Sequence, residues 1–245
     1  ISTQVGCRMG CRFCASTVGG LIRSLKTSEM LDQIYEIQRT TGERVSNIIL
    51  MGIGEPLDNY DNVVKFIRMI SDENGLNISQ RNITLSTCGI VPKINELADM
   101  HFQITLALSL HASNNETRKS LMPIAYKYSI DEVINACKNY FAKTGRRITF
   151  EYSLVAGQND TVEEADALCR LVKGMNCHIN LIPVNPIKER DYVQSGKKAV
   201  EQFKNRVEKN KINVTIRREM GRDINGACGQ LRNEAMKGRK EESNV

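Results

Sequence analysis

The sequence predicts an α/β protein with a parallel β-sheet, and two observations lead to this fold class. Short runs rich in β-branched and aliphatic residues alternate with segments of helical apolar spacing along almost the whole chain. Strands that alternate with helices imply parallel pairing, because parallel neighbours need a crossover connection. The length of 245 residues suits one large domain, since single α/β barrels commonly have this size.

The first predicted elements surround a cysteine-rich segment. A short strand is expected over Ile1–Val5, before that segment. Apolar residues recur at helical spacing in Ser28–Thr41, and Thr27 or Ser28 is the expected N-cap of this helix. The apolar run Val45–Met51 then predicts a buried strand.

Each later helix has its own local signal. Asn62–Ser71 carries its apolar residues on one face, and Val91–Met100 opens with Pro92, which the first turn of a helix tolerates. Ile130–Lys143 ends before Gly145, an expected C-cap residue. The remaining elements continue the alternation, with strands over Asn82–Ser86, Gln103–Leu110, Ile148–Val155, His178–Val184 and Ile212–Arg217, and helices over Val162–Gly174 and Lys197–Lys209.

Composition excludes several protein classes. Hydrophobic residues make up 41% and charged residues 25% of the chain, which excludes a wholly disordered or collagen-like protein. The longest apolar runs, such as Ile48–Met51 and Leu106–Leu108, are far too short to cross a bilayer, and we recognise no signal peptide. The 8 cysteines are too sparse for a small secreted disulfide scaffold, so we expect a cytoplasmic protein. The net charge of +6 permits a polyanionic partner without requiring one.

Three cysteines, Cys7, Cys11 and Cys14, lie close together in the spacing C-x3-C-x2-C. Thiolates are soft ligands that suit iron–sulfur clusters or zinc. A cubane cluster usually takes four cysteines, so three would leave one iron open to another ligand. A closed zinc site would instead need a fourth protein ligand, and a set of unrelated structural thiols is the third interpretation.

Small and polar residues follow several predicted strands. Gly54 and Glu55 come after Val45–Met51, where a glycine lets a ligand approach the backbone and a carboxylate suits an ammonium group. Taken singly, such residues are more often structural caps and turns. Because the carboxyl ends of parallel strands share one edge of a sheet, we expect these residues to lie together. The other candidates are Ser86, Ser109, Leu110, His111 and Asn185.

Seven sequence motifs also occur in a fixed order: VGCRMGCRFCAS, MGIGEPLDN, ITLSTCGIVPKI, LALSLHA, LMPI, NLIPVN and DINGACGQL. Together they resemble the family of dual-specificity 23S rRNA and tRNA adenine-C2 methyltransferases of the radical S-adenosylmethionine (SAM) superfamily. The resemblance covers essentially the whole chain. It implies a partial (β/α)6 barrel and a 4Fe–4S cluster held by Cys7, Cys11 and Cys14. It further implies that SAM chelates the fourth iron and that the strand-end candidates line its pocket.

By the same resemblance, Cys228 is the catalytic methyl carrier. The family uses two SAM molecules per turnover, one to methylate this thiol and one to give a 5′-deoxyadenosyl radical. That radical takes a hydrogen from the S-methyl group, and the resulting methylene radical adds to adenine C2. Because C2 is electron-poor, radical addition is more favourable there than polar methyl transfer. A second cysteine, whose family position lies just before Ile1, then releases the product by forming a disulfide bond.

The resemblance also implies the partners and the domain organisation. The substrates are an adenosine near the peptidyl transferase centre of 23S rRNA and the adenosine beside the anticodon of some tRNAs. The expected electron donor is a protein such as flavodoxin, and the expected state is a monomer with no membrane partner. We expect a methyltransferase core over residues 1–236 and a polar tail over 237–245, without the N-terminal RNA-binding domain of the family. Basic groups in the sequence are, taken singly, more often solvated surface. The last group leads into the Cys228 segment and is the candidate for positioning RNA phosphates. The basic residues are Arg146, Arg147, Lys188 and Arg190, and in the last group Arg217, Arg218 and Arg222.

Three alternatives remain open at this point. A related antibiotic-resistance enzyme methylates C8 of the same rRNA adenosine and shares the cluster, carrier and pocket. A zinc-stabilised RNA-binding domain would need neither SAM nor Cys228. A radical SAM enzyme acting on small molecules would not depend on RNA. Among the other cysteines, Cys137 and Cys169 lie in helical patterns and are expected core thiols, and Cys88 and Cys177 have no assigned role.

Overall fold

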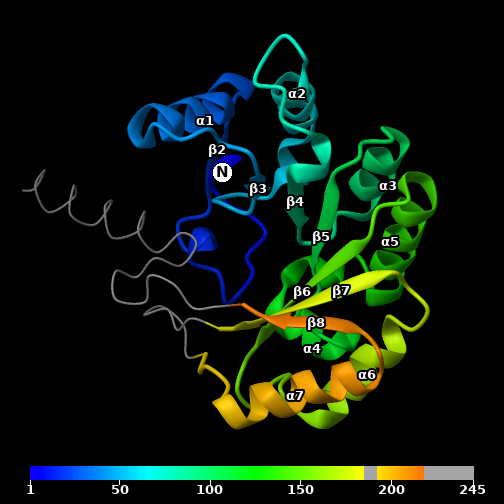
Figure 1. Ribbon diagram of the computed structural model, residues 1–245. Helices are drawn as coiled ribbons and strands as arrows, with labels where there is room; N and C mark the ends of the chain where they lie inside the picture. The colour runs from blue at the N-terminus through cyan, green and yellow to red at the C-terminus, as the bar shows by residue number, and fades with distance from the viewer. Residues whose placement is uncertain (185–191, 218–245) are drawn as a thin grey trace, which may run out of the picture.

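Six parallel strands form the central sheet of the protein (Figure 1). The structure is a computed structural model and describes residues 1–184 and 192–217. The strands pair in the order β3-β4-β5-β6-β7-β8, and every pair is parallel. In the described residues β3 and β8 do not pair with each other, so the sheet is an open, partial barrel, as expected. Their bounds are β3 (Ile48–Leu50), β4 (Ile83–Thr87), β5 (Thr105–Ser109), β6 (Ile148–Leu154), β7 (Cys177–Pro183) and β8 (Asn213–Ile216).

Helices make the crossovers between consecutive strands. In Figure 1 they lie along the top, right and bottom of the sheet, whereas the N-terminal segment lies on the left. This arrangement leaves one face of the curved sheet to the N-terminal segment. The α-helices are α1 (Thr27–Thr41), α2 (Tyr60–Ser71), α3 (Val91–Asp99), α4 (Asn115–Leu121), α5 (Ile130–Thr144), α6 (Val162–Leu171) and α7 (Lys197–Lys209).

The core lies between the sheet and these helices. In β5, Leu106, Ala107 and Leu108 are all fully buried, because a strand in the middle of a parallel sheet is covered on both faces. Cys137 and Cys169 are buried in the same core, which confirms their expected role as core thiols. The seven cysteines in the described part of the chain are all free thiols.

The capping residue predicted from the sequence is confirmed at the C-terminus of α5 and is wrong at the N-terminus of α1. Gly145 caps α5 in the left-handed conformation at φ 66°, as predicted. The N-cap of α1 is Lys26, so the prediction of Thr27 or Ser28 is wrong. Glu29 at the third helical position accepts a hydrogen bond of 2.8 Å from the Lys26 backbone N–H, and this bond starts the helix one residue earlier.

The N-terminal segment contains elements that the sequence did not reveal. A two-stranded antiparallel sheet joins β1 (Gln4–Gly6) to β2 (Leu21–Ser24), so the first strand begins three residues later and ends one residue later than expected. Short 3₁₀ helices, labelled η, complete the loops: η1 (Ala15–Thr17), η2 (Pro56–Asn59), η3 (Gln80–Asn82) and η4 (Pro123–Tyr126). No helix within residues 1–184 and 192–217 is both long enough and apolar enough to span a membrane.

Candidate functional site

The three clustered cysteines lie on the loop between β1 and β2, which we call the cysteine loop (residues 7–20). A hydrogen bond from the Cys7 N–H to the Gly20 carbonyl at 3.0 Å joins its two ends, and one from the Arg12 N–H to the Leu121 carbonyl at 2.9 Å holds its middle. Gly6, just before the loop, has φ +83°, and a Cβ there would lie 1.9 Å from the Gly20 oxygen. Only glycine therefore fits at the start of the cysteine loop.

The cysteine loop closes one side of a pocket of about 200 Å³ at the carboxyl ends of the strands. We call it the strand-end pocket. Every strand of the sheet contributes a residue or an adjoining turn, so residues far apart in the sequence meet here. The pocket lining includes Cys7, Cys11, Phe13, Cys14, Gly54, Glu55, Ser86, Cys88, Ser109, His111, Met122, Glu151, Ser153, Ile182 and Arg217.

The thiols of the cysteine loop suit a soft metal cluster by their chemistry. Cys7 and Cys11 are buried and Cys14 is half-buried. Burial raises the pKa of the Cys7 thiol to about 12 and the pKa of Cys11 above its usual value. Thiolates at these positions therefore need a bound cation, and a metal ion deprotonates its thiol ligands outright. The donor set of three thiols on one short loop fits an iron–sulfur cluster with one open iron.

A closed zinc site would need a fourth protein ligand beside the three cysteines. Within residues 1–184 and 192–217, no three His, Cys, Asp or Glu side chains are arranged as metal ligands; this holds for the three cysteines as well, so it does not distinguish zinc from an iron–sulfur cluster. Of the histidines, only His111 lines the strand-end pocket. His101 is exposed with its Nδ1 3.3 Å from the Lys143 carbonyl, and His178 contacts Thr215 at 2.9 Å. No histidine has therefore joined the cysteines as a fourth ligand.

Glu55 is a buried carboxylate held by the backbone. Oε1 accepts a hydrogen bond from the Leu57 N–H at 3.0 Å, and Oε2 accepts one from the Cys88 N–H at 2.8 Å. Burial raises the pKa of Glu55, and these hydrogen bonds act in the opposite direction. The side chains of Thr87 and Cys88 also hydrogen-bond this carboxylate. Because its two oxygens offer about four acceptor sites, a cationic group from the pocket would share or replace one of these side-chain contacts.

Gly54 precedes Glu55 and brings the backbone close to the N-terminal segment. Its φ is +109°, and a Cβ there would lie 2.6 Å from the Gln4 Cβ. The Gln4 Oε1 in turn accepts the Glu55 N–H at 2.9 Å. The close approach therefore sets the position of the Glu55 backbone.

His111 lines the pocket as a neutral ring. Its Nδ1 accepts the Ser153 N–H at 2.9 Å, and since a backbone N–H can only donate, the proton of the ring lies on Nε2. Burial, assisted by the charge of Arg118, lowers the pKa of His111 to about 3. The Phe13 ring packs edge-on at 4.6 Å between centroids. His111 thus offers a fixed Nε2–H donor over the ordinary pH range.

The other sequence candidates fall into three groups. Ser86 and Ser109 line the strand-end pocket beside Glu55 and His111. Leu110 is fully buried in the core instead, and its N–H donates to the Glu151 carbonyl at 3.0 Å. The candidates Asn185 and Cys228, the basic residues Lys188, Arg190, Arg218 and Arg222, and the tail 237–245 lie outside the described residues.

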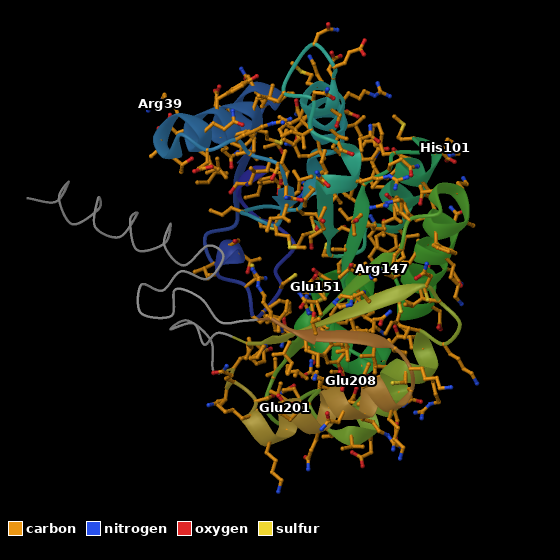
Figure 2. All side chains as sticks on the ribbon, in the orientation of Figure 1. Arg39, His101, Arg147, Glu151, Glu201 and Glu208 are labelled. Carbon is orange, nitrogen blue, oxygen red and sulfur yellow. The ribbon has the colours of Figure 1, made fainter. Side chains whose placement is uncertain are left out.

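Sequence reasoning missed Glu151 as a pocket residue. It lies in β6, lines the pocket, and accepts a hydrogen bond of 2.8 Å from Asn180. Burial raises the pKa of Glu151, and the charge of Arg217, another lining residue, lowers it. The available signal was a charged residue inside the apolar strand sequence ITFEYSL. Figure 2 shows Glu151 toward the N-terminal segment and Arg147 nearer the other end of β6, so the Arg146–Arg147 pair does not line this pocket.

Comparisons with known proteins agree with this architecture. The profile of the radical SAM superfamily matches residues 1–172. A relative from Lachnospira eligens, named "Probable dual-specificity RNA methyltransferase RlmN", is 71% identical over 236 residues, which cover 96% of this chain and 67% of that protein. A relative of the same name from Clostridium novyi is 62% identical over 232 residues, with coverages of 95% and 68%. The chain thus spans about two thirds of the length of these relatives.

Solved structures give the same result for the fold. A radical SAM methyltransferase from Sphaerobacter thermophilus is 42% identical with a TM-score of 0.90, and the match covers 94% of this chain and 68% of that one. A spore photoproduct lyase variant, at 14% identity and a TM-score of 0.64, covers 87% of this chain and 74% of its own. At such low identity the second likeness shows the fold alone.

Proposed function

Because the chain belongs to the radical SAM superfamily and, within it, to the RlmN family of dual-specificity RNA methyltransferases, we propose that it methylates C2 of adenosine in RNA. The proposed substrates are 23S rRNA at the peptidyl transferase centre and tRNA beside the anticodon, both in the cytoplasm. The observation that carries this proposal is the convergence of the cysteine loop and the polar strand ends on one pocket. Such a pocket brings an electron source next to a bound cosubstrate.

In this proposal Cys7, Cys11 and Cys14 hold a 4Fe–4S cluster. When bound, the cluster supplies one electron to SAM and so provides a carbon radical that can abstract hydrogen. The loop contributes two properties of its own. Its thiols, of which Cys7 and Cys11 are buried, limit the access of water to the metal, and its Phe13 supplies apolar surface beside them, together with Met122 from the segment after α4.

The strand-end residues position SAM. The Glu55 carboxylate receives the ammonium of the methionine moiety, since both its oxygens are already fixed by backbone N–H groups. Ser86, Ser109 and the neutral Nε2–H of His111 offer hydrogen bonds to polar atoms of the same molecule. Asn185, on the sequence evidence, belongs to this set.

Cys228 is the proposed methyl carrier, and each turnover uses two SAM molecules. Resolution of the RNA adduct by a disulfide, an electron donor such as flavodoxin, and a monomeric state belong to the same proposal. Arg217 lines the pocket and leads toward Arg218, Arg222 and Cys228 in the sequence. These cations would neutralise RNA phosphates close to the reacting base without reading its sequence.

The test is anaerobic reconstitution of the protein with iron and sulfide, followed by SAM and peptide mass spectrometry. We expect cluster absorbance and a methyl group on Cys228. Cys14→Ala should lose the cluster, whereas Cys228→Ala should keep the cluster and lose the methyl group. Protein that takes up only zinc would contradict the proposal.

The position of the methyl group on modified RNA tests the regiochemistry. RNA lacking the modification is incubated with the reconstituted protein, SAM and a reductant, and digested nucleosides are compared with 2-methyladenosine and 8-methyladenosine standards. We expect the 2-methyl product. An 8-methyl product would assign the chain to C8 chemistry instead.

A further inference from the structure

Arg118 in α4 is a buried cation that the function described above does not use. The whole residue is fully buried. Its Nη2 donates a hydrogen bond of 2.7 Å to the Cys88 carbonyl. Its Nε and Nη1 have no hydrogen-bond partner among the described residues. Buried polar groups are nearly always paired, so two unpartnered donors on one buried cation call for an explanation.

The surroundings of Arg118 contain thiols and no partner carboxylate. None of the ion pairs between described residues involves Arg118. The groups whose negative charge would act on the guanidinium are the thiolates of Cys88, Cys11 and Cys137. Cys137 is a core thiol, whereas Cys88 and Cys11 belong to one buried cluster next to the cysteine loop, so the partner charge comes from the side of that loop.

The helix that carries Arg118 supports the cysteine loop directly. The C-terminal residue of α4, Leu121, accepts the Arg12 N–H at 2.9 Å. Cys11, Cys88, Leu121 and Met122 form one buried apolar cluster beneath the loop. Arg118 itself does not line the strand-end pocket, whereas Cys11, Cys88 and Met122 of this cluster do. Through its bond to the Cys88 carbonyl the cation lies directly beside this cluster.

We propose that Arg118 is a positioning residue that supplies the buried counter-charge to the cluster held by the cysteine loop and raises its reduction potential. The proposal rests on the proposed function. Three thiolates give the loaded loop a net negative charge, and reduction adds one more electron. A fixed positive charge in a medium of low dielectric constant stabilises the more negative, reduced state more than the oxidised state. Among the described residues this cation has no counter-ion and two donors without partners, and a cluster on the cysteine loop would supply the missing negative charge.

The test compares Arg118→Met and Arg118→Lys with the wild-type protein and with Arg146→Met. Arg146 is a matched control, because its Nε also lacks a partner while its Nη2 bonds Thr105 at the amino ends of the strands. Each protein is reconstituted anaerobically, and the cluster is titrated against a reductant by absorbance and electron paramagnetic resonance. We expect Arg118→Met to lower the ratio of reduced to oxidised cluster at least tenfold at a fixed potential. A tenfold lower ratio of reduced to oxidised cluster corresponds to a reduction midpoint potential lower by about 59 mV for one electron. Arg118→Lys and Arg146→Met should stay within a few-fold of wild type.

Unfolding by urea distinguishes a role of Arg118 as counter-charge to the cluster from a role in stabilising the fold alone. Without cluster, Arg118→Met should unfold at a urea concentration close to that of wild type, because the substitution removes a buried charge without a counter-ion together with its hydrogen bond to the Cys88 carbonyl. Binding of the cluster should raise the urea concentration at the unfolding midpoint more for wild type than for Arg118→Met. A less stable unloaded Arg118→Met, or an unchanged reduction midpoint, would overturn the inference. If wild type itself takes up no cluster, the proposed function fails instead.

Discussion

At the scale of single residues, His111 shows how the fold sets a protonation state. Its pKa of about 3 lies below the value of about 6.5 expected in the unfolded chain. The unfolded state therefore binds a proton that the folded state does not. The stabilising contribution of neutral His111 is fully present above pH 6.5 and is lost as the pH falls toward 3.

The lowered pKa of His111 predicts that the difference in unfolding free energy between wild type and His111→Gln depends on pH. Because glutamine does not titrate, the free energy of unfolding of wild type relative to the variant should fall below pH 6.5. The slope approaches about 1.4 kcal/mol per pH unit, the value for one proton. Urea unfolding at pH 7, 6 and 5 measures the difference. An equal difference at pH 7 and pH 5 would show that His111 is not held neutral.

Glu55 predicts a second effect, on both stability and ligand affinity. Glu55→Gln leaves one of the two backbone donors, Leu57 or Cys88, facing an amide NH₂ group. The variant should lose about 1–3 kcal/mol of unfolding free energy. It should also bind SAM at least tenfold more weakly, because the ammonium loses its counter-charge. Equilibrium dialysis measures the affinity, with the exposed Glu96→Gln as control, and unchanged affinity in Glu55→Gln would remove Glu55 from the SAM site.

Single residues differ in how far the sequence could predict them. The cysteines, Gly54 and Glu55 are recognisable because their spacing or their place after a strand is local information. Arg118 is not, since it looks like an ordinary charged residue until the fold buries it, and Glu151 has only the weak signal of a charge within an apolar strand. Leu110 shows the converse limit, because its place at a strand end does not reveal that its side chain is buried in the core, and its proposed place in the SAM site stays a prediction.

At the scale of elements, the hairpin formed by β1 and β2 positions the cysteine loop. Gly6→Ala should distort it, since a Cβ 1.9 Å from the Gly20 oxygen forces the two strands apart. We expect the variant to retain only a minor fraction of wild-type iron and sulfide after reconstitution. Gly19→Ala is a matched control, because a Cβ there meets nothing within 4 Å. Equal iron content in the two variants would contradict a positioning role for the hairpin.

The elements that the sequence missed share a physical reason. β2 has only four residues, of which two are exposed, so no alternation is visible. In α4 only Arg118 and Leu121 are buried, and its sequence NETRKSL lacks an apolar face. Its start is set by Asn114, whose side chain accepts the Thr117 N–H at 2.8 Å. Longer amphipathic helices such as α7 do have an apolar face. The predicted bounds of α7, Lys197–Lys209, agree with the structure.

At the scale of the whole molecule, strand order repeats chain order, so the polar residue after each strand reaches the same edge. This regularity is why the gathering of the candidates could be predicted without their side-chain contacts. The size and lining of the pocket could not, because they depend on the N-terminal segment closing one side. That closure follows from contacts of Ile1–Gln4 with the turn after β3, such as the bond from the Thr3 N–H to the Ile53 carbonyl at 2.9 Å.

A ligand that contacts both the cysteine loop of the N-terminal segment and the strand ends of the sheet should therefore stabilise the two against unfolding together. SAM at a hundred times its Kd is expected to raise the free energy of unfolding of the cluster-loaded protein by about 2.7 kcal/mol. In Cys14→Ala the same SAM concentration should give a much smaller gain, because the ligand loses its contact with the cysteine loop and binds the strand ends alone. Urea unfolding under anaerobic conditions, with and without SAM, measures both gains. Equal gains in the two proteins would mean that SAM binds without the loop, and the pocket would then work as a site of the sheet alone.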